Sequence, residues 1–83
     1  SRFWARYEKA LVKQRVKDSL RRWYVTRVEH YIKAAKGRKL STHGPEEVTA
    51  FLDEQGSRPR VQDWQLAQSA HAIQILFCDV IQV

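Results

Sequence analysis

Methionine is absent from this 83-residue chain, and cysteine, proline and glycine are scarce. The single cysteine, Cys78, excludes an internal disulfide and a multi-cysteine metal site, so a reducing compartment is the expected setting. No apolar run approaches the roughly 18 residues of a membrane-spanning helix, and no charged-then-apolar leader is present. We therefore expect neither export nor insertion into a membrane. Because the chain begins at Ser1 and stops inside the apolar run AIQILFCDVIQV, we also expect a domain excised from a longer protein.

Patterns that carry catalysis are missing as well. The sequence contains no nucleophile–base pair, no glycine-rich phosphate loop and no paired acids of defined spacing. The histidines lack the spacing of metal ligands, and the tyrosines fall on core-facing stripes; these residues are His30, His43, His71, Tyr7, Tyr24 and Tyr31. We therefore expect a non-enzymatic domain without a metal, a cofactor or a small-molecule ligand, in which Cys78 acts as a small hydrophobic residue near the core.

Carboxylates are scarce in the first half of the chain only. Residues 1–39 hold thirteen Lys or Arg against Glu8, Asp18 and Glu29, a net charge of +10. Residues 40–83 hold Arg58 and Arg60 against six carboxylates, a net charge of −4. A basic half of this kind suits an anionic polymer or surface as the partner.

The apolar residues recur at helical spacing, and no segment alternates apolar and polar residues as a half-buried strand does. Breaks at 16–19, 36–45 and 55–63 separate four helical segments. Asp18 or Ser19 and Asp63 are the expected N-caps, Gly37 the expected C-cap, and Pro45 the expected first helical residue. We predict a single all-α domain over 1–83, a small four-helix bundle with orthogonal packing, in which an N-terminal helix at 1–16 precedes a core at 17–83.

Each helix is expected to turn one apolar stripe toward a common core. The expected core residues are Phe3, Trp4, Tyr7, Ala10, Leu11, Leu20, Trp23, Tyr24, Val28, Tyr31, Ile32, Ala35, Val48, Phe51, Leu52, Leu66, Ala67, Ala70, Ile73, Leu76, Phe77, Val80 and Ile81.

Two polar surfaces are left outside these stripes. The second helix carries a basic face with few carboxylates, although interleaved charges would stabilise a purely solvated helix better. The fourth helix, expected at 63–81, carries an outer surface of Gln62, Gln65, Gln68 and Ser69 just after Arg58 and Arg60. Glutamine amides can contact base edges and arginines can contact phosphates or guanine, although both residue types are also common on solvated helices. If the second and fourth helices pack together, the two surfaces could straddle one major groove of DNA.

The order and spacing of LRRWYVTRVEHYIKAAKGRKL, PEEVTAFLDEQ and VQDWQLAQSAHAIQILFCDVI resemble a known family. These segments are similar to the N-terminal core-binding, SAM-like domain of tyrosine recombinases, specifically integron and phage integrases. The resemblance covers roughly residues 17–82. It departs from the family at DSLRR and at RPRVQDW, where serine or threonine clusters are usual, and it places Asp63 near the expected DNA side.

The resemblance implies a double-stranded-DNA-binding module that forms one jaw of a clamp around a recombination site. A catalytic domain outside this chain would form the other jaw, and neighbouring recombinase protomers would be partners. The protein would be associated with DNA in the cytoplasm of a prokaryote. Carried over by position, the DNA-binding residues are Arg21, Arg22, Thr26, Lys33, Arg38, Lys39, Arg60, Gln65, Gln68 and Ser69.

Two other functions compete with this interpretation. The chain could be a helical protein-interaction domain that mediates protomer association through apolar residues at its surface. The candidates for that role are Trp4, Trp64, Ile81 and Val83. A basic helix lying on an anionic membrane is the weaker alternative, because the apolar stripe of the second helix is needed for the core.

Overall fold

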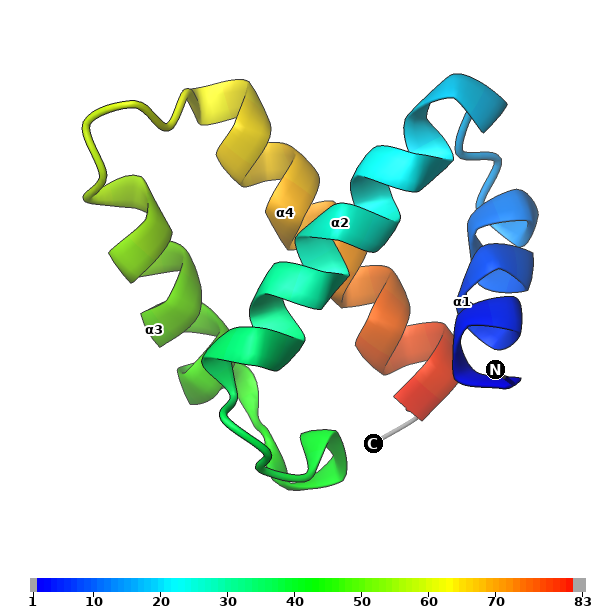
Figure 1. The fold of residues 1–83 in the computed structure, drawn as a ribbon, viewed down its shortest axis with the longest axis horizontal. Coiled ribbons are helices and arrows are strands. Elements are labelled where there is room, and N and C mark those ends of the chain that lie inside the picture. Colours follow the sequence, from blue (N-terminus) through cyan, green and yellow to red (C-terminus); the bar gives the residue numbers. More distant parts are fainter. Residues whose placement is uncertain (1, 82–83) are drawn as a thin grey trace.

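The computed structural model describes residues 2–81 as four α-helices and two short helical segments of other kinds (Figure 1). The α-helices are α1 (Arg2–Lys13), α2 (Asp18–Ala34), α3 (Pro45–Gly56) and α4 (Asp63–Ile75). A 3₁₀ turn, η1 (Leu40–Thr42), precedes α3, and a π-helical segment, η2 (Leu76–Ile81), continues α4. Residues 2–81 contain no strand, which confirms the predicted all-α fold with four helices.

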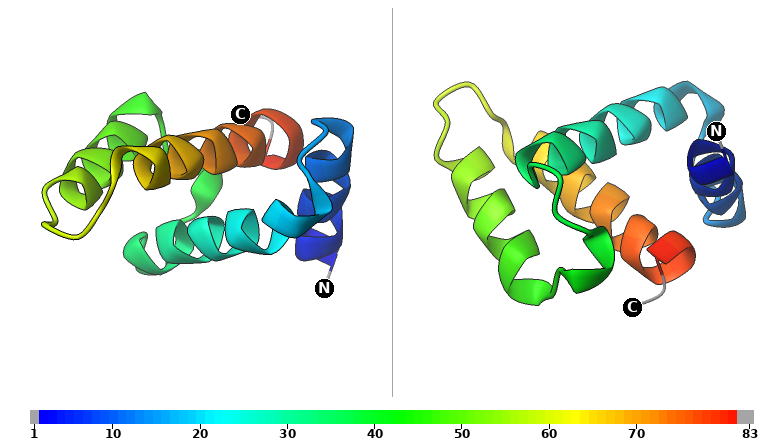
Figure 2. Two further views of the ribbon diagram at one scale, coloured as in Figure 1. Left: turned by 90° about the horizontal axis from the view of Figure 1, so that it is seen from above. Right: turned by 60° about the horizontal axis from the view of Figure 1, so that its bottom comes forward.

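The helix α2 lies across α4, and the other two helices pack at opposite ends of this crossing. Figure 1 shows the crossing face-on, and Figure 2 shows α2 and α4 as two stacked layers. At one end α3 packs against α4, and at the other end α1 packs against η2 and α2. The acidic helix α3 and the basic helix α1 are therefore held apart.

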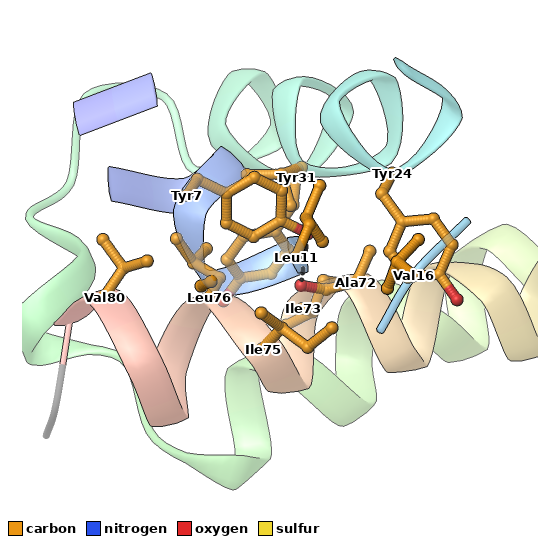
Figure 3. Close-up of a cluster of buried hydrophobic side chains, with 12 residues drawn as sticks. Tyr7, Leu11, Val16, Tyr24, Tyr31, Ala72, Ile73, Ile75, Leu76 and Val80 are labelled. Atoms are coloured by element: carbon orange, nitrogen blue, oxygen red, sulfur yellow. Dashed lines mark hydrogen bonds between the residues drawn. The ribbon is translucent and has the colours of Figure 1, made fainter. Parts of the chain in front are cut away.

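The core fills the space between the two layers, where side chains of α1 and α2 meet those of α4 and η2 (Figure 3). Tyr7, Leu11, Val28, Ile73 and Leu76 are the largest fully buried side chains. Burying one such apolar side chain stabilises a fold by about 1.5–3 kcal/mol. Because α1 supplies two of the five, it belongs to the same core as residues 17–81.

Polar contacts also hold α1 and the residue that follows it against α4 and η2. The Tyr7 hydroxyl donates to the carbonyl oxygen of Ala72 at 2.8 Å. Arg6 donates from Nη2 to the carbonyl oxygen of Val80 at 2.7 Å, and Gln14 donates from Nε2 to Asp79 at 2.9 Å. Burial raises the pKa of the Tyr7 phenol above its usual value, so its hydroxyl stays protonated and remains a donor.

Helix ends differ from the predicted ones by one or two residues. The N-caps of α2 and α4 are Lys17 and Gln62, each one residue before the expected aspartate. Pro45 is the first residue of α3, as predicted. The helix α2 ends at Ala34, and Gly37 follows in a turn with a φ of 83°, a conformation that suits glycine.

Parts of the predicted core are wrong. Leu20 and Trp23 are 37% and 45% exposed, because α4 crosses α2 and leaves the first turns of α2 uncovered (Figure 1). Ala67 is exposed too, whereas Ala72 and Ile75 are buried. The predicted helix at 63–81 changes to π geometry at Leu76.

Cys78 is exposed and does not contribute to the core as predicted. Its neighbours Leu76 and Val80 point inward within η2 and are buried. A residue midway between two inward-facing positions one turn apart lies on the opposite side of the helix. The prediction failed because it followed the apolar character of cysteine and not the position of residue 78 around the helix.

The bond between Tyr7 and Ala72 gives a stability prediction. Tyr7→Phe removes one buried donor and should lower the free energy of unfolding by about 1 kcal/mol, as measured by urea denaturation. The Ala72 carbonyl keeps its bond from the backbone N–H of Leu76, so no acceptor is stranded. Tyr24→Phe is the control and should lose less, because the Tyr24 hydroxyl bonds to the exposed side chain of His71. Equal stability of Tyr7→Phe and the unmodified chain would contradict this account.

Candidate nucleic-acid interface

The ten residues predicted to bind DNA lie on α2, on α4 and in the turns that precede η1 and α4. Arg21, Arg22, Thr26 and Lys33 lie on α2, and Arg38 and Lys39 lie in the turn before η1. Arg60 lies in the turn before α4, and Gln65, Gln68 and Ser69 lie on the first half of α4. Some of these residues line one of two concave sites described below, and others lie on the exposed face of α2.

The second and fourth helices pack against each other, which was the condition for a shared surface. At the crossing, Arg27 Nε of α2 donates to Gln68 Oε1 of α4 at 3.0 Å. The Tyr24 hydroxyl of α2 and Nδ1 of His71 on α4 are hydrogen-bonded at 2.7 Å. Arg27, which flanks the basic face of α2, and Gln68 of the amide-rich surface of α4 therefore meet at a seam, whereas Arg22 and Lys33 remain exposed.

A pocket of about 450 Å³ opens beside this seam. It is lined by Arg27 of α2, by Arg60 of the turn and by Gln65 and Ser69 of α4, together with Arg58 at the end of α3. Three of the predicted residues are thus brought together. Arg27 and Arg58 were not among the ten, because sequence spacing alone could not show that they converge on the start of α4.

A wider groove of about 950 Å³ runs between the second half of α2 and α3. It contains two of the predicted residues, Lys33 and Arg38. Arg38 Nη2 lies 3.5 Å from a carboxylate oxygen of Glu47 on α3, so part of its charge is neutralised. Arg21, Arg22, Thr26 and Lys39 line neither hollow.

The predicted outer surface of α4 needs correction at three residues. Ser69 is only 8% exposed and is not part of the outer surface. Gln65 and Gln68 are half-buried, and their side-chain oxygens already accept bonds from Gln62 N–H and Arg27. These polar side chains turn inward because α4 packs against both α2 and α3. The amide N–H groups of both glutamines remain available as donors to a ligand.

Arg21 and Thr26 are also occupied within the protein. Arg21 bonds to Asp18 and donates from Nη1 to the carbonyl oxygen of Val16 at 3.2 Å, an arrangement that secures the start of α2. The Thr26 hydroxyl donates to the carbonyl oxygen of Arg22 one turn earlier at 3.0 Å. Arg21 therefore has mainly a structural role in this conformation.

Most of the Lys and Arg side chains have no anionic partner within residues 2–81. Of the fifteen Lys and Arg residues, three form ion pairs within residues 2–81, namely Arg21, Arg38 and Arg58. Arg6 and Arg27 donate to neutral oxygens. The other ten are exposed, with neither an ion pair nor a side-chain hydrogen bond in the described part of the chain: Arg2, Lys9, Lys13, Arg15, Lys17, Arg22, Lys33, Lys36, Lys39 and Arg60.

Large apolar side chains also reach the surface. Trp64 at the start of α4 is 62% exposed, and Val12 of α1 is 58% exposed. The guanidinium carbon of Arg22 lies 5.1 Å from the ring centre of the exposed Trp23, a cation–π arrangement. Among the other apolar candidates for protein association, Trp4 and Ile81 are partly buried in the core, and Val83 lies outside the described residues.

The three tyrosines and His43 are engaged in packing, whereas His30 and His71 are exposed. Tyr7, Tyr24 and Tyr31 are all buried, and burial raises the pKa of each phenol. The hydroxyl of Tyr31 is hydrogen-bonded to Nδ1 of the buried His43.

No cluster of potential metal ligands occurs within residues 2–81. In the same residues no helix is both long and apolar enough to cross a bilayer.

Comparison of the chain with protein-family models, with curated proteins and with solved structures finds no match. The interpretation of the interface therefore depends on the geometry and charge described above.

The hydrogen bond from Gly44 to Glu47 gives a pH prediction. The backbone N–H of Gly44 donates to Glu47 at 2.7 Å, and this bond, reinforced by the Glu47 backbone N–H and Arg38, holds the pKa of the carboxyl below its usual value. A lowered pKa stabilises the fold above the usual pKa, and this stabilisation is lost as the pH falls through the folded value. Glu47→Gln should therefore be less stable than the unmodified chain at pH 7, and this deficit should shrink as the pH is lowered toward 3.

Urea unfolding at the two pH values measures this difference. Glu46→Gln is a matched control, because Glu46 lies in the same first turn of α3 but forms no ion pair with the described residues. A deficit in Glu47→Gln that persists unchanged at pH 3, or an equal deficit in Glu46→Gln, would contradict the assignment.

Proposed function

We propose that this chain is a double-stranded-DNA-binding module of a site-specific tyrosine recombinase, in which it forms one jaw of a clamp around the recombination site. The observation that carries the proposal is the set of ten exposed cations without an anionic partner in the described chain. Mutual repulsion of these charges opposes folding, whereas a polyanion would neutralise them and release counterions.

The distribution of charge favours one face for the duplex. Four of the nine carboxylates lie on α3, at the end of the molecule away from α1 (Figure 1). The exposed side of α2 carries Arg22 and Lys33, and Arg60 lies beside the start of α4. A duplex that follows α2 and meets the start of α4 would contact these cations and avoid the outer side of α3.

The half-buried amides at the seam suit such a contact. The bond between Arg27 and Gln68 fixes both side chains before any ligand binds, so less conformational entropy is lost on binding. The amide N–H groups of Gln65 and Gln68 remain as donors to base edges or phosphates. The recombinase assignment itself is supported by the resemblance of three helices in order and spacing.

Protein association is a second candidate function, supported by the exposure of Trp64 and Val12. Tryptophan is enriched at the energetic centres of protein interfaces. Recombinase protomers that neighbour each other on DNA could use such residues, so the two functions are compatible. Sedimentation that detects self-association, together with no response to duplex DNA, would favour this second function alone.

Salt dependence tests the DNA-binding proposal. If about five cations contact phosphates, a plot of log affinity against log salt concentration should have a slope near −4 to −5. The measurement is fluorescence anisotropy of a labelled duplex over a series of salt concentrations. An affinity that is independent of salt would rule out phosphate contacts as the basis of binding.

Charge reversal on α2 tests the proposed face. The double variant Arg22→Glu with Lys33→Glu should weaken duplex binding more than about 100-fold, because it places carboxylates beside phosphates. Circular dichroism should show unchanged helicity, since both side chains are exposed.

The matched control is Lys9→Glu with Lys13→Glu, which changes the net charge equally on the exposed side of α1. It should weaken binding far less, through long-range attraction only. Equal losses in the two double variants would show that net charge, and not the α2 face, controls binding.

A further inference from the structure

The pocket of about 450 Å³ beside the crossing of α2 and α4 is unusual in its lining. It lies between the middle of α2, the end of α3, the turn at 58–61 and the first half of α4. Its nine lining residues include three arginines and no carboxylate: Arg27, Gln55, Arg58, Pro59, Arg60, Val61, Gln65, Leu66 and Ser69. A concave site with several cations and no acid in its wall favours an anion.

Two of the three arginines are fixed by bonds that leave donors free. Arg27 uses its Nε to donate to Gln68, so both of its Nη groups remain for a ligand. Arg58 donates from Nε and Nη2 to one carboxylate oxygen of Glu54, at 3.2 and 2.9 Å. Arg60 is exposed and forms no ion pair with the described residues. With Glu54 counted against them, the three arginines leave a charge of +2 at the pocket.

Ser69 adds a hydroxyl to the wall of the pocket, although the residue is only 8% exposed. This hydroxyl forms no side-chain hydrogen bond within residues 2–81, whereas the comparable hydroxyl of Thr26 bonds to the carbonyl one turn earlier. Among the described residues the one enclosed side-chain polar atom without a partner is His43 Nε2, so the Ser69 hydroxyl is open to solvent. It is therefore available to donate to a ligand in the pocket.

Gln65 adds a further donor one turn before Ser69. Its Oε1 accepts the backbone N–H of Gln62 at 2.8 Å, which caps the start of α4. This bond holds the amide in place and leaves its N–H groups as donors. The positive end of the α4 dipole lies at the same turn, and it also favours an anion.

We propose that this pocket is a phosphate-binding subsite. The guanidinium groups of Arg27 and Arg60 would contact phosphate oxygens, and the Ser69 hydroxyl and the Gln65 amide would donate to them, a donor set that matches phosphate geometry. The phosphate could belong to a DNA backbone or to a small phosphomonoester. The DNA source rests on the proposed function, whereas the subsite itself does not.

The first experiment uses inorganic phosphate as the probe. NMR spectra of the ¹⁵N-labelled chain are recorded during a phosphate titration, with chloride adjusted to keep the ionic strength constant. The Nε–H signals of Arg27 and Arg60 and the backbone amide of Ser69 should shift together and saturate. Absence of a shift, or equal shifts at every arginine of the chain, would overturn the proposal.

Variants separate the pocket from general attraction between phosphate and a basic protein. Arg60→Gln and Ser69→Ala should each weaken phosphate binding by about threefold or more, a small effect that matches the loss of one donor. Arg15→Gln removes an exposed cation in the turn between α1 and α2, which Figure 1 shows at the opposite side of the molecule from the start of α4, and it should leave the phosphate titration unchanged. If Arg15→Gln weakens binding as much as Arg60→Gln, the pocket is not the site.

A second experiment identifies the source of the phosphate. If the DNA backbone supplies it, Arg60→Gln should reduce the salt slope of duplex binding by about one, and free phosphate should compete with the duplex at the pocket signals. Saturable phosphate shifts with unchanged duplex binding in Arg60→Gln would support a small phosphomonoester instead. Duplex binding that leaves the pocket signals unmoved would overturn the DNA-backbone source, and phosphate binding without any duplex binding would overturn the proposed function alone.

Discussion

The packing of α2 across α4 is the constraint on which the other features of the molecule depend. It buries Tyr24, Val28 and Tyr31 of α2 against the apolar side of α4 and η2. Because the helices cross, their ends extend beyond the contact and leave room for α1 and α3 at opposite ends (Figure 1). The same crossing brings Arg27 to Gln68 and sets the α4 side of the basic pocket. Stability and the proposed binding site therefore share one contact.

The distribution of charge in this molecule destabilises the fold, because the cations repel one another. Ten exposed cations have no anionic partner in the described chain, and their repulsion must be offset by the apolar core and by bonds such as that from Tyr7 to Ala72. Four carboxylates lie on α3, where Glu47 and Glu54 pair with the nearest arginines. This separation keeps these four acids away from the exposed side of α2, where Glu29 lies between Arg22 and Lys33. A function that requires an anionic partner accounts for the arrangement.

The sequence predicts the helices well, because apolar spacing and Pro45 reflect local geometry that the chain alone determines. It predicts the surroundings of individual residues less well. The periodic stripe of α2 includes Leu20 and Trp23, yet only the crossing point decides which part of that stripe is covered. Ser69 looks like a surface residue in the sequence, and its burial follows from the position of α4 between α2 and α3. The convergence of Arg27, Arg58 and Arg60 likewise depends on tertiary contacts that spacing does not encode.

Mapping the duplex onto the protein tests the central claim most directly. The backbone amides of the ¹⁵N-labelled chain are followed by NMR as an unlabelled DNA duplex is added at low ionic strength. We expect the perturbed amides to gather on the exposed side of α2, in the turn at 58–61 and at the start of α4, with the outer side of α3 unchanged. Perturbations centred on α3, or no perturbation at any attainable duplex concentration, would contradict the account.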